Sequence, residues 1–154
     1  MKKTSNKGFS MVELIIVIAI MAILAAALAP SLIKYINKSR LSTDITTGTS
    51  IADAASAAMA VEAANDAIGA YENGTSDVNQ ILSQRGSNSY ASEFASVLGV
   101  NSVKGKSKKD LAGTSLSNSF WISFNPGSNN VTVWYGVTDN DHIVVPNAGS
   151  RLSE

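Results

Sequence analysis

A single ionisable side chain, Glu13, lies in the apolar stretch from Phe9 to Pro30. As a helix this stretch would be roughly 33 Å long, which matches the thickness of the hydrocarbon core of a bilayer. A carboxylate in that core costs free energy unless it is protonated or paired, so an intramembrane acid is by default a functional residue with a partner. The alternative is that Glu13 lies at the headgroup edge, because it is close to the start of the stretch. The sequence therefore predicts a membrane-spanning helix with Glu13 as its candidate functional residue.

The residue types give little support to enzymatic chemistry. The chain has no cysteine, which excludes a thiol nucleophile, and its one histidine, His142, leaves too few ligands for a histidine-rich zinc site. We expect His142 to have a packing or surface role. Asp139-Asn140-Asp141 resembles part of a calcium loop but lacks the spaced ligands and the bidentate glutamate, so a β-turn is favoured. We therefore expect no enzyme, no catalytic residue, no cofactor and no metal.

The run Gly8-Phe9-Ser10-Met11-Val12-Glu13-Leu14, followed by Ile, Val, Ala and Leu residues up to Pro30, resembles the class III signal of type IV pilins and of the pseudopilins of type II secretion. The resemblance implies that a prepilin peptidase cuts between Gly8 and Phe9 and that Phe9, the new amino terminus, is N-methylated. It also implies that Glu13 pairs with the Phe9 amine of a neighbouring subunit in a fibre. Ser10 stands where the family more often has threonine, and we expect no consequence from this difference.

The resemblance divides the chain into four expected segments. Residues 1–8 are the prepilin leader, which is removed, and residues 9–30 are the transmembrane and assembly half of a long helix. Residues 31–73 are its amphipathic half, and residues 74–154 form a globular head. The leader lysines fit the positive-inside rule, which places the head outside the cytoplasm. A single-pass protein of the cytoplasmic membrane would thus become part of an extracellular pilus.

Several partners and functions follow from the resemblance. The expected partners are further copies of the chain in a helical filament, the prepilin peptidase and methyltransferase, the pilus assembly machinery, and the cytoplasmic membrane before assembly. We favour a structural pilus (fimbrial) subunit, and motility, adhesion, DNA uptake and secretion are all compatible with it. A pseudopilin shares every residue of the motif. The third alternative is a secreted soluble domain behind an ordinary signal peptide cut after Ala27-Leu28-Ala29, but the long apolar core, Pro30 and Glu13 count against it.

The charge balance of the chain is even, with 12 basic and 12 acidic side chains. Removal of the three leader lysines would leave a mature charge of about −3, which argues against a broad grip on nucleic acid. Four lysines gather in one short stretch and are a candidate surface for DNA, acidic polysaccharide or an acidic neighbour: Lys104, Lys106, Lys108 and Lys109. Because no aromatic residues alternate with them, a solvated loop is favoured and nucleic acid remains an unsupported partner.

The helix is expected to continue through Pro30, which would kink it, as far as about Tyr71, with a stop at Asn73-Gly74. Two apolar lines follow its second half. One line would pack on the domain's own sheet and the other on neighbouring subunits, or both would form one broad buried face. The first line is Leu41, Ile45, Gly48, Ala52, Ala55 and Met59, and the second is Ile51, Ala54, Ala58, Val61 and Ile68.

The rest of the chain predicts a small α+β head. A short helix is expected after Asp77, which has Gln80 three residues on as in a capping box, and a second short helix should include Tyr90 and Phe94 and end at Gly99. Alternating residues predict antiparallel strands over 120–124, 131–137 and 142–145. Three strands with one apolar face need a cover, so we expect the long helix to pack on the sheet in the ladle-like fold that pilins share.

Overall fold

A computed structural model describes residues 8–71, 74–125, 130–146, 149 and 151–152. The chain divides into two compact units, Met1–Ile36 and Asn37–Glu154. Helix α1 (Met11–Met59) contributes to both units and runs without interruption through Pro30. Continuation of the helix past this proline confirms the sequence prediction, and a kink at Pro30 stays a prediction. The expected leader, residues 1–8, lies outside the described residues except for Gly8.

The second unit contains one antiparallel sheet with the strand order β1-β2-β3-β4. The strands are β1 (Thr75–Asp77), β2 (Phe120–Asn125), β3 (Asn130–Tyr135) and β4 (Ile143–Val145). Residues of β2 and β3 alternate between the buried and the exposed face, as the period-2 pattern predicts. The inward residues of these two strands are Phe120, Ile122, Phe124, Val131, Val133 and Tyr135.

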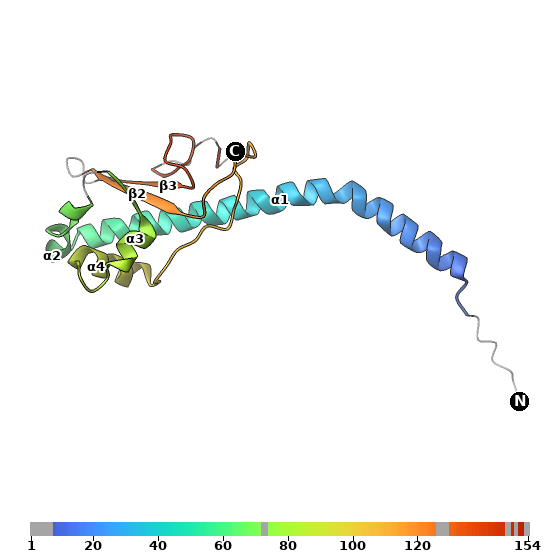
Figure 1. The fold of residues 1–154 in the computed structure, drawn as a ribbon, viewed down its shortest axis with the longest axis horizontal. Coiled ribbons are helices and arrows are strands. Elements are labelled where there is room, and N and C mark those ends of the chain that lie inside the picture. Colours follow the sequence, from blue (N-terminus) through green and yellow to red (C-terminus); the bar gives the residue numbers. More distant parts are fainter. Residues whose placement is uncertain (1–7, 72–73, 126–129, 147–148, 150, 153–154) are drawn as a thin grey trace, which may run out of the picture. The chain divides into compact units, whose positions relative to one another are not determined.

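The second half of α1 covers the apolar face of the sheet (Figure 1). Gly48 allows the close approach, because a Cβ there would lie 2.5 Å from Cγ1 of Val144 in β4. Both predicted apolar lines of α1 are buried in this one core, apart from half-buried Ile45 and exposed Val61. The alternative of one broad buried face is therefore confirmed. This packing of a helix on an antiparallel sheet also confirms the α+β class.

The two short helices agree with their predictions. Helix α3 (Val78–Ser83) begins at Asp77, whose side chain accepts a hydrogen bond from the backbone N–H of Asn79 at 2.7 Å. Helix α4 (Ser89–Leu98) ends at Gly99, which has a left-handed φ of 72°. Tyr90 of α4 is fully buried and its hydroxyl donates to the Ala55 carbonyl of α1. The helix α4 is thereby fixed beside α1.

Two element boundaries differ from the prediction, and one strand was not predicted. Helix α1 ends at Met59 rather than near Tyr71, because Val61 is extended and the chain turns into helix α2 (Glu62–Asn65) and a 3-10 turn η1 (Ile68–Ala70). This turn lets Ile68 and Tyr71 reach the core, which a straight helix would carry them past. Strand β3 stops at Tyr135 rather than at residue 137, because Gly136 has a φ of 80° and donates to the Ser119 carbonyl. Strand β1 was not predicted at all.

Candidate assembly segment and the head that it carries

The start of α1 is a reciprocal capping arrangement between Ser10 and Glu13. The Ser10 hydroxyl accepts a hydrogen bond from the backbone N–H of Val12 at 3.3 Å, and the Glu13 carboxylate accepts one from the backbone N–H of Ser10 at 2.9 Å. Each side chain thus satisfies a backbone donor that the first helical turn leaves open. A threonine would offer the same capping hydroxyl, so the expectation that serine in place of threonine has no consequence stays a prediction. The Ser-x-x-Glu spacing was the signal that could have revealed this capping box.

The proposed cleavage residues Gly8 and Phe9 lie just before this cap. Both precede the first residue of α1 and both are exposed, with Phe9 at 90%. A peptidase needs an extended peptide bond, which a hydrogen-bonded helix does not offer, and the Gly8–Phe9 bond lies outside the helix. After cleavage the new amine would be one residue from the N-cap. The same helix end also carries a partial positive charge, which favours the Glu13 carboxylate.

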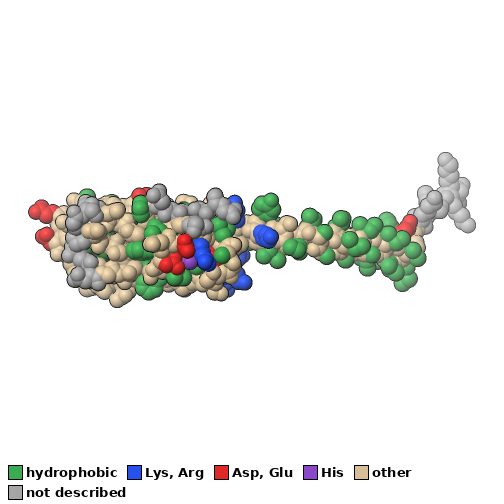
Figure 2. Space-filling view, turned by 90° about the horizontal axis from the view of Figure 1, so that it is seen from above, with side chains coloured by type: hydrophobic (Ala, Val, Ile, Leu, Met, Phe, Trp, Pro, Cys, Tyr) green, Lys and Arg blue, Asp and Glu red, His purple; other side chains and the backbone are tan. Residues whose placement is uncertain are grey.

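The surface of α1 in the first unit is apolar on all sides from Leu14 to Pro30, with Glu13 before this stretch and Ser31 and Lys34 after it. From Met11 to Ile36 every residue of α1 is exposed, including Ile16 at 53%, Leu24 at 57% and Ile33 at 67%. Figure 2 shows hydrophobic side chains along this stem. The helix is long and apolar enough to cross a membrane by length and composition. A helix that is apolar all round requires lipid or protein on every side. The unit is therefore suited to a bilayer or to a bundle of similar helices.

The lysine-rich stretch of residues 104–109 is held against α1 rather than being a free loop. The buried carboxylate of Asp44, 2% exposed, accepts the backbone N–H groups of Lys106 and Ser107 at 2.8 Å each. Asn37 of α1 contributes a second attachment, since its side chain accepts from the Ser107 hydroxyl at 2.9 Å. Gly105 permits the close fit, because a Cβ there would lie 2.0 Å from Cε2 of Tyr135.

The hydroxyl of Tyr135 completes this attachment by donating to the Ser107 carbonyl. Burial raises the pKa of Tyr135, and the nearby negative charge of Asp44 raises it further. The four lysines themselves, Lys104, Lys106, Lys108 and Lys109, are all exposed. The structure thus holds their backbone in one conformation with the charges outward, and the prediction of a merely solvated loop misses the attachment to α1.

A second cluster of charges surrounds His142, directly before β4. His142 is only 3% exposed and its Nε2 lies 3.3 Å from Oδ2 of Asp110, which is itself 1% exposed. The Arg151 guanidinium donates to the same oxygen at 3.3 Å. Burial raises the pKa of Asp110, but hydrogen bonds from Thr114, Arg151 and His142 outweigh it, so the net shift is downward. His142 is therefore packed inside the head beside the Arg151–Asp110 ion pair, which is one of the two roles, packing or surface, that the sequence left open.

Asp139 forms the turn that precedes His142. Its Oδ1 accepts the backbone N–H groups of Asp141 at 3.1 Å and of His142 at 3.0 Å. This is the aspartate-stabilised turn that the sequence favoured over a calcium loop. Within the described residues no group of three or more His, Cys, Asp or Glu side chains is arranged to hold a metal ion. The carboxylates of this region are occupied by backbone donors, His142 and Arg151.

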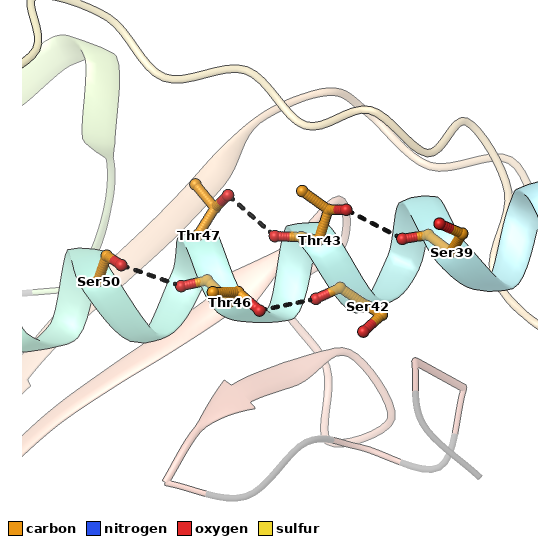
Figure 3. Close-up of a pocket in the computed structure, with 6 residues that line it drawn as sticks. All are labelled: Ser39, Ser42, Thr43, Thr46, Thr47 and Ser50. Carbon is orange, nitrogen blue, oxygen red and sulfur yellow. Dashed lines mark hydrogen bonds between the residues drawn. The ribbon is translucent and has the colours of Figure 1, made fainter.

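The exposed face of α1 in the head carries a row of hydroxyl groups that lines a shallow hollow (Figure 3). Four of these hydroxyls, on Thr43, Thr46, Thr47 and Ser50, donate to carbonyls of their own helix four residues back, as Thr43 does to Ser39 at 3.0 Å and Ser50 does to Thr46 at 3.1 Å. The donors of these four side chains are thus already used within the helix. The hollow is lined by Ser39, Ser42, Thr43, Thr46, Thr47 and Ser50.

Comparison with known proteins places the recognisable part of the chain at its amino-terminal end. Residues 3–29 match the family described as Prokaryotic N-terminal methylation motif. No curated protein and no solved structure matches the chain. The motif is that of structural, pilin-type precursors, which prepilin peptidase processes and which assemble into pilus-type filaments. The chain therefore carries the class III signal of a type IV pilin-like or pseudopilin precursor, at the start of a long apolar helix that continues into an α+β head.

Proposed function

We propose that this chain is a structural, non-enzymatic subunit of a type IV pilus-like extracellular filament. It is inserted in the cytoplasmic membrane through α1, cut between Gly8 and Phe9, N-methylated at Phe9, and then polymerised through the same helix. One observation carries the proposal: the methylation motif at residues 3–29 lies at the start of a helix whose apolar span is not buried by the rest of the chain.

The energetics of that surface support polymerisation. Complete burial of one Leu or Ile side chain is worth about 1.5–3 kcal/mol, and more than ten large apolar side chains of the first unit are half exposed or more. In the membrane, lipid covers them. Outside the membrane the same residues would be in water unless neighbouring stems cover them, so a bundle of parallel stems is the arrangement that removes them from water.

Glu13 supplies the register of that bundle. Among the described residues, Oε2 of Glu13 accepts the backbone N–H of Ser10, which leaves Oε1 able to accept from the Phe9 amine of a neighbouring subunit. In the low dielectric of a helix bundle a lone carboxylate is costly, and pairing recovers much of that cost. A stem shifted along its neighbour would separate the two charges, so the pairing favours one axial position.

The decisive experiment is the amino-terminal sequence and mass of the protein recovered from sheared cell-surface material. A polymeric chain that begins with methylated Phe9 would support processing and assembly together. A soluble chain that begins near Pro30 would refute the proposal, since the helix would then be a discarded signal.

A further inference from the structure

The head carries a group of exposed cations beside the part of α1 that follows the apolar segment. We propose that this group binds the anionic phospholipid headgroups of the membrane and holds the head against the bilayer before assembly. We call it the basic collar and define it as Lys38, Arg40, Lys104, Lys106, Lys108 and Lys109. The inference rests on the membrane stage of the proposed function.

The fold, not the sequence, brings the collar together. Lys38 and Arg40 lie in α1, whereas the four lysines follow about 65 residues later and reach α1 through the Asp44 and Asn37 contacts. The side-chain amide of Asn37 also donates to the Lys109 carbonyl at 3.3 Å. Lys38 is the residue after Asn37, so the lysine stretch lies beside the helical turn that begins the head. Figure 2 shows Lys and Arg side chains gathered at one end of the head.

The four loop lysines of the collar are available to an external partner. All six side chains are exposed. Among the described residues, the salt bridges of the head join Asp110, Asp139 and Asp141 to His142 and Arg151, and none involves the four loop lysines. Two acids lie beside the loop, and both are buried. Asp44 accepts backbone N–H groups of the loop, and Asp110 is paired with His142 and Arg151. The outward charge of the lysine stretch is therefore positive.

The position of the collar in the chain indicates lipid rather than another anion. The exposed apolar residues of α1 continue to Tyr35 and Ile36, and Lys38 follows two residues later. Aromatic residues and then Lys or Arg are typical of the bilayer interface, where long basic side chains reach the headgroups. Because no linker separates the head from the spanning helix, the collar meets a headgroup layer at high local concentration. Single-stranded nucleic acid would in addition require exposed aromatic side chains between the loop lysines, and residues 104–109 include none.

Each Lys or Arg near an anionic membrane surface contributes about fivefold to partitioning at ordinary salt. Loss of the four loop lysines would therefore lower the ratio of docked to undocked heads by up to several hundredfold. The attraction is screened within about 3 Å at about 1 M salt, compared with about 10 Å at 0.1 M. The contact should thus depend on both lipid charge and salt.

The test uses the full chain in vesicles, with one cysteine introduced for a fluorophore because the natural chain has none. Ser102→Cys places the label next to the lysine stretch, and Ser56→Cys places it further along α1 as a reference. Phosphatidylcholine with a nitroxide on its headgroup quenches a label that lies at the membrane surface. Vesicles are symmetric, with or without phosphatidylglycerol, so the orientation of the inserted chain does not matter.

We expect the Ser102→Cys label to be quenched more strongly with phosphatidylglycerol than without it, and this difference should vanish at about 1 M salt. The label at position 56 should change little. Replacement of all four loop lysines by Gln should abolish the difference. The matched control makes the same change in net charge at exposed residues elsewhere on the head and should keep the difference in quenching between the two lipids. Its substitutions are Ala57→Asp, Ala60→Glu, Ala63→Glu and Asn65→Asp.

Equal quenching in both lipids, or an unchanged difference in the Gln variant, would overturn the inference. Quenching that rises with the ratio of protein to lipid would mean that the collar binds a second copy of the chain rather than lipid, and this result would also overturn the inference. If the Gln variant loses the near-UV circular dichroism of its folded head, it cannot test the lysines. The inference is then judged from the dependence of quenching on salt and lipid in the chain that keeps its lysines. Filaments without lipid-dependent docking would refute only the collar, and docking without filaments would refute only the proposed function.

Discussion

Replacement of Asp44 by Ala should destabilise the head more than any other single loss of charge on α1. The Asp44 carboxylate is 2% exposed and accepts two backbone hydrogen bonds, from Lys106 and Ser107, both at 2.8 Å. Hydrogen bonds to a charged group are worth about 1.5–3 kcal/mol each, and the buried donor left behind at Ser107 loses its partner. Part of this loss in stability is offset, because the variant no longer has to bury a charged group. We therefore expect a loss of about 3 kcal/mol in the free energy of unfolding.

The measurement is equilibrium unfolding in urea, in detergent, followed by the fluorescence of Trp121 and Trp134, which lie in β2 and β3. Asp53→Ala is the matched control, because Asp53 is an exposed acid on the same helix and its loss should cost less than about 0.5 kcal/mol. Asp44→Asn should be nearly as harmful as Asp44→Ala, since its NH2 group would face one of the two backbone donors.

Equal stability of the Asp44→Ala and Asp53→Ala variants would refute this reasoning, because it would mean that the two backbone donors find other partners. A stable Asp44→Ala variant whose loop has moved would be recognised by weaker lipid-dependent quenching at position 102. A loss of stability with unchanged quenching would mean that the loop keeps its place through Asn37 and Tyr135 alone.

Four further results are expected. Gly8→Ala should leave the leader attached, as read by mass. Since no atom of the described residues lies within 4 Å of an added Cβ, a retained leader would not report misfolding, and normal cleavage would refute the assigned cut. Glu13→Val should permit cleavage and insertion but prevent ordered filaments in electron micrographs, and wild-type filaments would remove the pairing from the mechanism. The lowered pKa of Asp110 means that the unfolded chain binds more protons, so the melting temperature should fall as the pH drops below about 4, and less steeply in Asp110→Asn. Gly48→Ala should cost about 1–3 kcal/mol of stability by overpacking against Val144, and Val144→Ala in the same chain should restore part of it.

The apolar first part of α1 was predictable because its sequence signal is dense and local. An uninterrupted apolar run, one acid and a glycine before phenylalanine occur within about 20 residues, and no tertiary contact modifies them. The alternating residues of β2 and β3 were predictable for a similar reason, since each strand has one buried face.

The missed features depend on contacts between distant residues. Strand β1 is short and polar and exists because Thr75–Asp77 pairs with the edge of β2. The end of α1 at Met59 lies in an alanine-rich stretch that favours helix, and the burial of Ile68 and Tyr71 overrides that propensity. Asp44 lies between the two apolar lines of α1, and its partners follow more than 60 residues later. By contrast, the Ser10 capping box was readable from spacing alone.

The cluster around Asp110 has a consequence for the order of folding. The Arg151 carbonyl accepts from the Leu111 backbone, its guanidinium reaches Asp110, and Leu152 is 3% exposed in the core. Since Arg151 and Leu152 follow the other described elements of the head in the chain, these elements are synthesised before the groups that close them. Until then Asp110 lacks a principal cationic partner. The contacts of Arg151 and Leu152 can therefore form only after the sheet and the helices of the head have been synthesised.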